Sequence, residues 1–557
     1  MSETKIATVA IIGGGLVGSL NAIYFANRGW KVDLYELRPD MRLPEQKKLQ
    51  RGKSINLALS ERGLSALRAT GLDLETVILD SAVPMHSRMV HLGKEGRQMS
   101  QPYSIHGEHI NAVDRARLNE LLLDQAEKMS NVTIYFEHQL HQADLKKGSM
   151  VFFQGETKSE VTKYADLIVG ADGAYSKMRA QMMRKIRMDY QQQYIDTGYC
   201  ELYMPPVMVN DQPHYALDPN HLHIWPRHTH MLIALPNPDK SFTCTLFMPF
   251  DMFENVSSKQ KLIAFFQENF NDAIPLIGED RLVDDYFSNP RGALITVKTS
   301  PHHYSDKAVI VGDAAHAMVP FYGQGMNCGF QDIQVFHKVL DAHNIKPTVH
   351  NNSISGLATA LAAYSDERVK DAHAICDLAM YNHYEMRSAV TSTRFLARKK
   401  LEGWIHLYLP KLITPLYSMV SFSTLPYSQA IRRWHQQSFW LNVVLGAAAV
   451  TTTSATAWVV YRMVRGPPSP PPRQSSAAIS GAVSSGLKTA ANVANTSVQS
   501  IGSLASSAAN AANTSVQSIG SMASSAGSSL GINQNTVNQL HDQVKSAAGY
   551  ATSWFWK

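Results

Sequence analysis

The sequence has few cysteines and little charge bias, and each absence argues against a class of protein. Its four cysteines lie far apart and form no CxxC pair, which argues against a disulfide framework or a zinc ribbon (Cys200, Cys244, Cys328 and Cys376). The net charge is +6, and the basic residues are scattered without interleaved aromatic side chains, so we predict no nucleic-acid partner. The histidine-rich spots His221/His223 and His302/His303 lack partner carboxylates at ligand spacing, so we predict no metal site.

Long apolar runs are missing until the C-terminal part of the chain. At the N-terminus, Glu3 and Lys5 precede apolar residues that lead into a glycine motif, which is unlike a secretory signal. The one long run is Phe439–Tyr461, which has no charge and is flanked by arginines on both sides. Its length spans a bilayer, so we predict a transmembrane helix at 438–461, with a buried or interfacial helix as the alternative. Basic flanks on both sides give no orientation.

Residues 467–557 form a low-complexity tail rich in Ala, Ser, Asn and Gly. The stretch NTSVQSIGS occurs at 495–503 and again at 513–521, and this period of 18 residues equals five α-helical turns. The repeat is compatible with a weakly amphipathic helix that contacts a membrane or a partner. A disordered spacer is the interpretation we favour, because the apolar stripe is thin.

The chain opens with a strand–helix–strand pattern. Residues 5–12 predict a short buried strand, a helical pattern follows to Gly29, and 31–36 predict the next strand. Two further buried strands are expected at 166–171 and 308–312, which indicates a doubly wound parallel sheet of the α/β class. Between them, residues 196–250 alternate apolar and polar positions, as an antiparallel sheet with one covered face does.

We therefore expect a dinucleotide-binding domain into which an antiparallel β-sheet substrate domain is inserted, followed by C-terminal helices and a membrane span. The expected boundaries are 1–185 and 301–395 for the two parts of the dinucleotide-binding domain, 186–300 for the β-sheet domain, 396–437 for a helical segment, 438–461 for the transmembrane helix and 467–557 for the tail.

The first strand leads into the motif Gly13-x-Gly15-x-x-Gly18. These glycines let the backbone approach a pyrophosphate, and the helix N-terminus supplies N–H donors and partial positive charge. Glu36, at the end of the second strand, would accept hydrogen bonds from a ribose diol and repel a phosphate there. This favours FAD or NAD over NADP. The alternative is a turn that only packs a helix tightly on a strand.

Two further acidic turns follow buried strands, at Asp172-Gly173 and at Gly312-Asp313. The second opens the run GDAAHAMVPFYGQGMNCG at 312–329. An acid at the end of a central strand can hold ribityl or ribose hydroxyls, and the glycine-rich turn after it can lie against an aromatic ring system. The ordered set of all three motifs is far more specific than any one of them.

This set resembles the single-component flavoprotein aromatic hydroxylases, which share the fold of p-hydroxybenzoate hydroxylase. Within that family the chain is most similar to members that hydroxylate kynurenine, and the similar runs cover about residues 5–461. They are RGKSINLALSERG (51–63), HIWPR (223–227), KSFTCTLFMPF (240–250), DAIPLIGE (272–279), GDAAHAMVPFYGQGMN (312–327), MYNHYEMR (380–387) and PLYSMVSFS (415–423). The resemblance implies a glutathione-reductase-type, Rossmann-like FAD-binding domain. The tail beyond 467 matches no family known to us.

The resemblance also implies which residues contact FAD. The first glycine turn and the second strand would hold the adenosine and pyrophosphate, and Arg115 would reach the pyrophosphate. Asp313 would hold the ribityl chain, while Ala58, Met326 and Asn327 would border the isoalloxazine ring. The full expected set is Gly13, Gly15, Val17, Gly18, Glu36, Arg38, Ala58, Arg115, Leu140, Asp172, Asp313, Met326 and Asn327.

For the substrate, the resemblance points to a carboxylate-binding group and an apolar wall. Arg88 would grip the α-carboxylate of kynurenine bidentately, helped by Tyr103, Asn382 and Tyr417. The wall around the aniline ring would consist of Phe247, Pro320, Phe321 and Tyr322. Without the resemblance, these residues would pass as a surface arginine, core tyrosines and a capping asparagine.

The implied reaction is hydroxylation of kynurenine to 3-hydroxykynurenine by NADPH and O2, through a flavin C4a-hydroperoxide. The flavin carries the chemistry, so we expect no catalytic side chain from the protein. No second GxGxxG module is present, so we expect NADPH to bind transiently in a groove. The resemblance further implies the mitochondrial outer membrane, with the catalytic part facing the cytosol.

Two other functions stay open at this point. One is a flavin monooxygenase or epoxidase for another aromatic or a lipid-like substrate, which the predicted membrane span favours and the predicted arginine–tyrosine group opposes. The other is a membrane-tethered flavoprotein scaffold without turnover, which the intact glycine and acidic motifs oppose.

Overall fold

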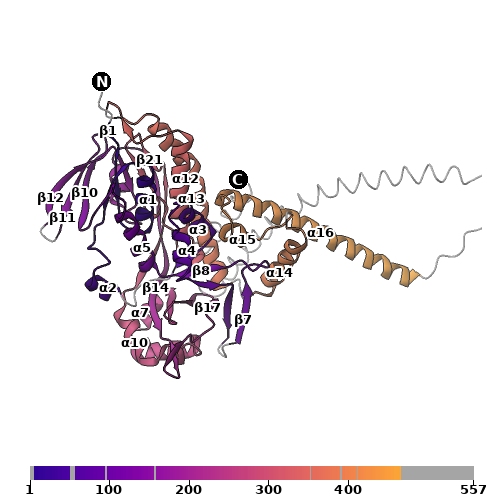
Figure 1. The fold of residues 1–557 in the computed structure, drawn as a ribbon. Helices are drawn as coiled ribbons and strands as arrows, with labels where there is room; N and C mark the ends of the chain where they lie inside the picture. Colours follow the sequence, from indigo (N-terminus) through magenta and orange to yellow (C-terminus); the bar gives the residue numbers. More distant parts are fainter. Residues whose placement is uncertain are drawn as a thin grey trace, which may run out of the picture. The chain divides into compact units, whose positions relative to one another are not determined.

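The computed structural model describes residues 5–50, 57–93, 97–155, 158–351, 353–388, 392–410 and 412–465. The chain divides into two units, Met1–Ala448 and Ala449–Lys557, and the fold below is that of the first (Figure 1). The tail with its 18-residue repeat lies outside the described residues, as does 51–56 within the first of the runs that resemble the family.

A six-stranded sheet forms the centre of the cofactor-binding part. Its strand order is β21 (His303–Tyr304), β22 (Ala308–Ile310), β13 (Leu167–Gly170), β2 (Thr8–Ile12), β3 (Lys31–Tyr35) and β9 (Val132–Tyr135). All neighbours pair in parallel except β21 with β22. The strands are short apolar runs because both faces are covered. This confirms the doubly wound sheet predicted from the sequence.

Alternate residues of β2 belong to two different core clusters, one on each face of this sheet. Val9 and Ile11 pack with three helices, α1 (Leu16–Asn27), α5 (Arg115–Glu127) and α12 (Gly325–Ala342). Ala10 and Ile12 pack on the opposite side. There the cover is a three-stranded sheet and α6 (β10 His138–Asp144, β11 Ser149–Gln154, β12 Ser159–Tyr164, α6 Lys177–Met183).

The second large sheet has seven strands and differs from the expectation in two ways. Its order is β20 (Gly292–Ser300), β14 (Asp189–Met204), β19 (Phe242–Pro249), β18 (His230–Pro236), β17 (His221–Arg227), β6 (Ser87–Leu92) and β7 (Arg97–Pro102). The strands β6 and β7 come from outside the expected range 186–300, and β6 pairs in parallel with β17. The sheet is therefore mixed, because its edge is completed by a hairpin from the part of the chain expected to bind the dinucleotide.

The two faces of the seven-stranded sheet have different neighbours. In β19, Cys244, Leu246 and Met248 pack against four short helices (α7 Phe250–Asn255, α8 Lys259–Asn269, α9 Ile274–Ile277, α10 Glu279–Ser288). Phe247 of the same strand points to the other face, where it meets Phe321 and the long helix α13 (Leu357–Arg387). The strand alternation thus places Phe247 towards the interior between the two large sheets.

The remaining elements are short strands and peripheral helices. A three-stranded sheet joins β4 (Leu57–Leu59), β8 (Ile110–Val113) and β5 (Val83–Met85), and two-stranded pairs join β1 (Lys5–Ile6) with β23 (Thr348–Val349) and β15 (Val207–Val209) with β16 (Gln212–His214). The other helices are α2 (Pro44–Gln50), α3 (Glu61–Arg68), α4 (Leu74–Leu79), α11 (Asp313–His316), the 3-10 turn η1 (Pro320–Tyr322), α14 (Thr393–Tyr408), α15 (Leu416–Ser421) and α16 (Tyr427–Arg465).

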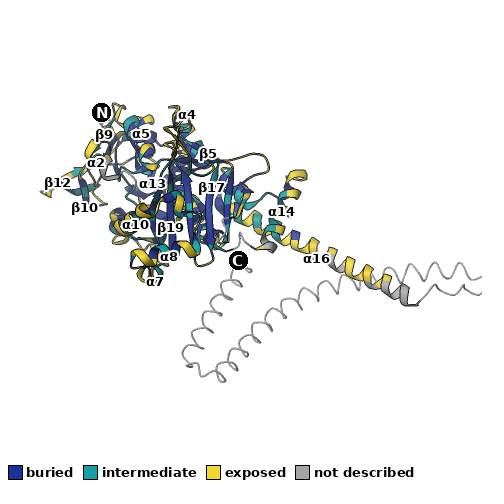
Figure 2. Ribbon diagram, turned by 90° about the horizontal axis from the view of Figure 1, so that it is seen from below, coloured by how far each residue is buried: buried dark blue, intermediate teal, exposed yellow. Residues whose placement is uncertain are grey.

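Helix α16 contains the expected membrane span, but it begins at Tyr427 and not near residue 438. Among the described residues it is the helix long and apolar enough to cross a membrane, over Tyr427–Thr456. Its first residues, Tyr427 and Ala430, are buried in the protein, whereas most side chains from Phe439 onward are exposed (Figure 2). The first residues of α16 are therefore packed in the fold, whereas the apolar side chains further along the helix are exposed.

Candidate active site

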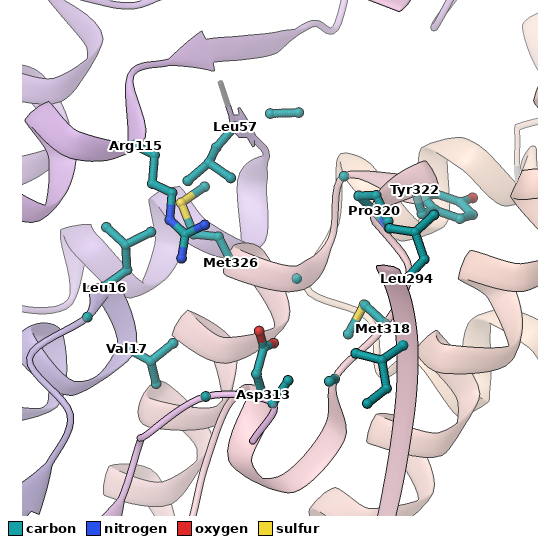
Figure 3. A pocket seen from close by; sticks show the side chains of 18 of the residues that line it. Leu16, Val17, Leu57, Arg115, Leu294, Asp313, Met318, Pro320, Tyr322 and Met326 are labelled. Atoms are coloured by element: carbon teal, nitrogen blue, oxygen red, sulfur yellow. The ribbon is translucent and has the colours of Figure 1, made fainter. Parts of the chain in front are cut away.

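One cavity of about 840 Å³ lies where the two large sheets meet. It is lined by the first glycine turn and the end of β3 on the cofactor side, and by β6, β19, η1 and α13 on the other. Figure 3 shows Arg115 and Asp313 pointing towards one another across part of this cavity, with Pro320 and Tyr322 further along. A single cavity thus joins residues of both predicted sets.

The turn between β2 and α1 leaves room for a ligand only at its tip. A Cβ on Gly13, whose φ is +107°, would lie 2.4 Å from the Ala171 carbonyl oxygen, and one on Gly18 would lie 1.9 Å from the Gly13 oxygen. A Cβ on Gly15 would meet no protein atom within 4 Å. Gly15 precedes α1 without a side-chain cap, so the first N–H groups of α1 are open to an anion.

Glu36 lies at the end of β3, beside this turn. Its Oε2 accepts a hydrogen bond from the Gly14 N–H at 2.8 Å, and its Oε1 accepts one from Arg38 Nε at 2.8 Å. Oε1 also accepts the Arg38 N–H at 3.1 Å, so Oε2 is the oxygen that retains a lone pair, and Glu36 lines the cavity. The carboxylate is therefore held in place by the glycine turn and can still accept a ribose hydroxyl.

A second glycine turn brings Asp313 to the cavity. Val17 fits between two glycines, since a Cβ on Gly312 would lie 3.2 Å and one on Gly329 2.5 Å from Val17 Cγ2. This packing locks the turn after β22 against α1. Asp313 lines the cavity and is accessible from it. The partial loss of water around its carboxyl group raises its pKa.

Most of the expected cofactor residues line the cavity, and two do not. Gly13, Gly15, Val17, Glu36, Arg38, Ala58, Arg115, Leu140, Asp172, Asp313 and Met326 line it. Gly18 is outside the lining because it packs against the Gly13 oxygen. Asn327 is fully buried, and its amide binds the Ala58 and Gly323 carbonyls and the Ser60 N–H. It acts on the cavity wall through these neighbours.

The carboxylate of Asp172 is occupied within its own turn. It accepts hydrogen bonds from the Ser176 hydroxyl at 2.5 Å and from the Met178 N–H at 3.0 Å. These bonds at the first turn of α6 explain the position of the carboxylate without a cofactor. The predicted cofactor role of Asp172 stays a prediction. Its neighbour Gly173 lines the cavity.

The open N–H groups at Gly15, the guanidinium of Arg115 and the carboxylates of Glu36 and Asp313 are complementary to FAD. The first two suit a pyrophosphate, and the carboxylates suit the ribose and ribityl hydroxyls. The residues present therefore fit an FAD molecule along this side of the cavity.

At the other side of the cavity, Arg88 of β6 is almost fully buried. Its Nη1 donates to Glu385 Oε1 at 2.9 Å, and its guanidinium lies 5.6 and 5.1 Å from the ring centres of Tyr103 and Tyr417. The two rings stack on each other at 4.9 Å. Burial opposes the charge of Arg88, but Glu385 and the tyrosines outweigh it and raise its pKa.

Two polar atoms in this group lack a hydrogen-bond partner among the described residues. They are Nε of Arg88 and the hydroxyl of Tyr103, and both belong to residues that line the cavity. A buried donor without a partner costs about 1–3 kcal/mol. An anionic group that entered the cavity here would satisfy both donors, so this end of the cavity is complementary to a carboxylate.

The expected aromatic wall is present beside this group. Phe247 packs on Phe321 with ring centres 5.0 Å apart, and Phe321 stacks on His383 at 4.1 Å. The Asn382 amide donates to the Phe321 carbonyl at 2.7 Å and so holds the turn η1 in place. Pro320 and Tyr322, with the other expected substrate residues, line the cavity.

Sequence reasoning missed two charged residues near Arg88. Glu385 forms the ion pair described above, and Lys399 of α14 lies close enough that Arg88, after burial, lowers the pKa of its amine to about 8. Glu385 follows Asn382 by three positions on α13, so both lie on one helix face. That spacing could have identified Glu385, whereas nothing in the sequence links Lys399 to this site.

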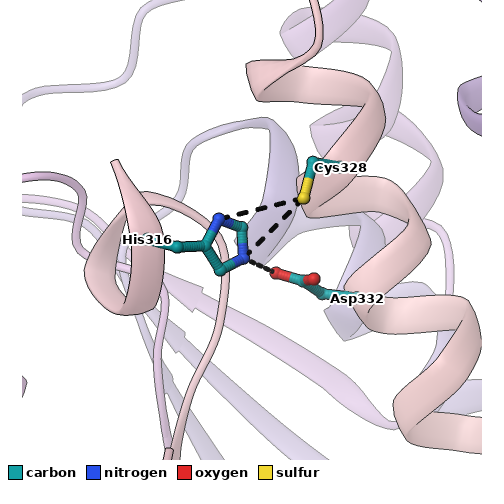
Figure 4. Close-up of side chains that lie close together, drawn as sticks. All are labelled: His316, Cys328 and Asp332. Atoms are coloured by element: carbon teal, nitrogen blue, oxygen red, sulfur yellow. Dashed lines mark hydrogen bonds and ion pairs between the residues drawn. The ribbon is translucent and has the colours of Figure 1, made fainter. Parts of the chain in front are cut away.

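A cluster of ligand-type side chains lies outside the cavity, at His316, Cys328 and Asp332 (Figure 4). His316 Nε2 lies 2.5 Å from Asp332 Oδ2, which also accepts the Gly312 N–H at 2.8 Å. The guanidinium of Arg368 binds the other Asp332 oxygen and lies 3.1 Å from Cys328 Sγ. Because Arg368 already contacts both Asp332 and Cys328, we interpret the cluster as an ion-pair network.

This network connects the Gly312–Asp313 turn with the start of α16. Arg368 also pairs with Asp371 at 3.5 Å, and Asp371 accepts hydrogen bonds from the N–H and hydroxyl of Ser428. Tyr427 lies over Arg368 and donates to Gln324.

The histidine-rich spots named in the sequence analysis form local bonds of their own. His302 binds the Thr299 carbonyl, and His221 pairs with Asp218 at 3.0 Å, a carboxylate partner that the sequence reasoning had not expected.

The family model described as "FAD binding domain" matches residues 6–378. Among curated proteins, the kynurenine 3-monooxygenase of Drosophila willistoni is 44% identical over 461 residues, which covers 82% of this chain and 96% of that protein. The kynurenine 3-monooxygenase of Sus scrofa is 44% identical over 444 residues (80% and 90%), and that of Candida albicans is 43% identical over 454 residues (80% and 96%).

Solved structures share the fold at low sequence identity. The tetrameric 2-methyl-3-hydroxypyridine-5-carboxylic acid oxygenase is 19% identical, with a TM-score of 0.53 and coverage of 70% of this chain and 95% of that one. The p-nitrophenol 4-monooxygenase of Pseudomonas putida is 17% identical, with a TM-score of 0.53 and coverage of 71% and 92%. Because the family model matches residues 6–378 and the sequence identity extends over four fifths of its length, the chain belongs to the kynurenine 3-monooxygenase family of FAD-binding flavoproteins.

Proposed function

We propose that this protein hydroxylates L-kynurenine to 3-hydroxykynurenine with FAD as bound cofactor and NADPH and O2 as co-substrates. One observation carries the proposal. The buried Arg88, with an unpaired Nε, shares a cavity with the dinucleotide turn. The names of the relatives describe the same reaction. A lipid-like substrate without an anionic group would leave the buried Arg88 Nε without a hydrogen-bond partner.

In the proposed binding mode, Arg88 binds the α-carboxylate of kynurenine and Tyr103 donates its hydroxyl to the same group. Tyr417 stacks on Tyr103 and keeps the guanidinium desolvated, which strengthens the charge-assisted bonds. Asn382 acts on the substrate through the Phe321 carbonyl that it binds. Arg88 therefore sets the position of one end of the substrate.

The aromatic ring of kynurenine then lies against Phe247 and Phe321, with Pro320 and Tyr322 completing the wall. When bound, FAD supplies the activation of O2 that inserts one oxygen atom into the ring. The amino group of the substrate already activates the neighbouring ring carbon, so the chain needs no strong acid or base. Its task is to position that carbon and to exclude water, which an apolar wall does.

The proposal includes attachment to the mitochondrial outer membrane through α16, with the catalytic part facing the cytosol. The length and apolar composition of that helix support the membrane attachment.

The test is NADPH consumption by the detergent-solubilised chain with and without kynurenine, with the product identified by mass. We expect strong stimulation by kynurenine and a product heavier by one oxygen atom. If the protein contains FAD but does not respond to kynurenine, it is a flavoprotein and kynurenine is not its substrate. A panel of aromatic and lipid-like compounds tested in the same assay would then identify the alternative.

A further inference from the structure

Helix α14 and the turn after it carry a dense group of exposed apolar side chains. Five large ones fall within nine residues and are between 49% and 65% exposed (Trp404, Leu407, Tyr408, Leu409 and Leu412). Scattered single apolar residues are normal on a soluble surface, but a contiguous group marks a surface that is covered in function. We call these five residues the 404–412 face.

The opposite side of the same helix is packed on the protein. His406 is buried, its Nδ1 lies 2.7 Å from the Ile413 carbonyl oxygen, and its ring meets that of His106 at 5.2 Å. The helix is therefore seated with a defined orientation. The 404–412 face points outward because its opposite side is already occupied.

The turn after α14 is bonded directly to α16. Arg433 Nη2 donates to the Thr414 hydroxyl at 3.3 Å, and the Gln437 amide pairs with the Thr414 backbone. Immediately beyond this contact, α16 exposes its own apolar residues (Phe439, Trp440, Val443, Val444 and Leu445). The turn that ends at Thr414 thus ties the element carrying the 404–412 face to the part of α16 just before its exposed apolar residues.

The composition of the 404–412 face suits the boundary of a bilayer. Trp and Tyr are enriched at membrane–water interfaces, and leucines beside them bury into the acyl boundary. Arg432, Arg433 and Lys400 lie close by in the sequence for contact with lipid phosphates. Helix α14 itself has 16 residues and carries several charges (Arg394, Arg398, Lys399, Lys400 and Glu402), so it is too short and too polar to span the bilayer.

We propose that the 404–412 face inserts into the headgroup–acyl boundary of the membrane that α16 crosses. The proposal rests on the membrane attachment proposed above and adds a second, non-spanning contact. On its inner side, His406 of α14 meets His106 in the loop after Tyr103, and Thr414 precedes Tyr417 by three residues. The membrane contact would therefore brace the two separate segments that carry the stacked tyrosines.

The test uses the FAD-loaded full chain in vesicles of phosphatidylcholine with an anionic lipid. All four native cysteines are buried, so a cysteine introduced on the surface can be labelled selectively with an environment-sensitive fluorophore. We place the label in Leu409→Cys, in Leu445→Cys on α16, and in Tyr164→Cys as a matched exposed control on β12.

We expect the label at position 409 to shift to the blue, to be quenched by brominated lipid and to be protected from aqueous iodide, while the control at 164 stays accessible to iodide. If position 445 enters lipid but 409 stays open to iodide, the face does not bind membrane, although the attachment by α16 stands. If neither position enters lipid, both proposals are rejected. Protection of 409 from iodide without quenching by brominated lipid would mean that a protein covers the face, which also overturns the proposal.

Discussion

The two ends of the cavity are built by different means. At the cofactor end, the important groups are open backbone N–H groups together with acidic side chains, and most of them lie in or beside two compact glycine turns at Gly13–Gly18 and Gly312–Asp313. At the substrate end they are side chains from four distant segments, among them Arg88, Tyr103 and Asn382. The nucleotide site therefore depends largely on local turn geometry, whereas the substrate site depends on side chains that only the folded chain brings together.

The largest expected effect comes from substitutions within the first glycine turn. Gly18→Ala places a Cβ 1.9 Å from the Gly13 oxygen, so we expect loss of the folded protein or of all bound FAD. Gly15→Ala is the matched control, because its Cβ meets no protein atom within 4 Å and points to the ligand side. That variant should keep the melting temperature of the FAD-free protein and bind FAD more weakly. Equal melting temperatures for both variants would contradict the assignment.

The next largest effect concerns the network below the cofactor end. Asp332→Asn leaves Arg368 and His316 buried without their counter-charge, which should cost about 3–5 kcal/mol in the free energy of unfolding. Because Asp332 also holds the Gly312 N–H, FAD retention should fall with it. Chemical denaturation and flavin content measure the two effects. A control is Asp341→Asn, which removes an exposed partner of Arg28 and should change stability by less than about 1 kcal/mol.

At the substrate end, Arg88→Ala should weaken kynurenine binding by about 2–5 kcal/mol, roughly 30-fold or more, because it removes the carboxylate partner and leaves Glu385 unpaired. FAD content should stay normal, since Arg88 makes no contact with the glycine turns. Substrate titration of the flavin absorbance measures the affinity. Arg38→Ala is the control at the cofactor end and should leave kynurenine affinity unchanged. Near-normal kynurenine affinity in the Arg88 variant would remove its proposed role.

The smallest expected effect is a pH dependence of stability, and it differs between His383 at the substrate end and His316 near the cofactor end. Burial lowers the pKa of His383, stacked on Phe321, to about 4, whereas Asp332 outweighs burial and raises the pKa of His316. Between pH 6.5 and about 4 the unfolded chain binds a proton at residue 383 that the folded chain does not. Stability is therefore lost as the pH falls through this window, by on the order of 1–3 kcal/mol for this residue.

The measurement is the melting temperature of the wild type and of His383→Asn from pH 7 to pH 4. The variant lacks the titrating ring, so the difference between the two curves should shrink as the pH falls. A difference that is constant with pH would mean that His383 is charged in the folded protein or that its ring is solvated.

Much of the cofactor end could be predicted because its signals are local. The glycine spacing, the acid after β3 and the GDAAH run each lie within one strand–turn–helix unit, so their geometry follows from short-range sterics. Two of the predicted cofactor residues, Gly18 and Asn327, lie outside the cavity lining and support it from behind. A motif does not distinguish such a supporting residue from a contacting one. The role of Asp172, which lines the cavity while its carboxylate bonds within its own turn, stays a prediction.

The substrate end was predicted from resemblance, not from the residues themselves. Periodicity correctly indicated an antiparallel pattern over β17–β19, but it could not show that β6 and β7 complete the same sheet. That pairing is what puts Arg88 opposite α13, where Glu385 neutralises it. The roles assigned to Arg88 and its neighbours stay predictions until they are measured.

The sequence by itself determined the class of fold, the dinucleotide turn and the apolar length of α16, because each can be recognised from short runs of neighbouring residues. The tertiary structure alone decided which charged groups meet. It paired Arg88 with Glu385, enclosed Asp332 between His316 and Arg368, and left the 404–412 face uncovered beside α16. The reason is physical. Burial gives these pairings their strength, and burial is a property of the whole fold.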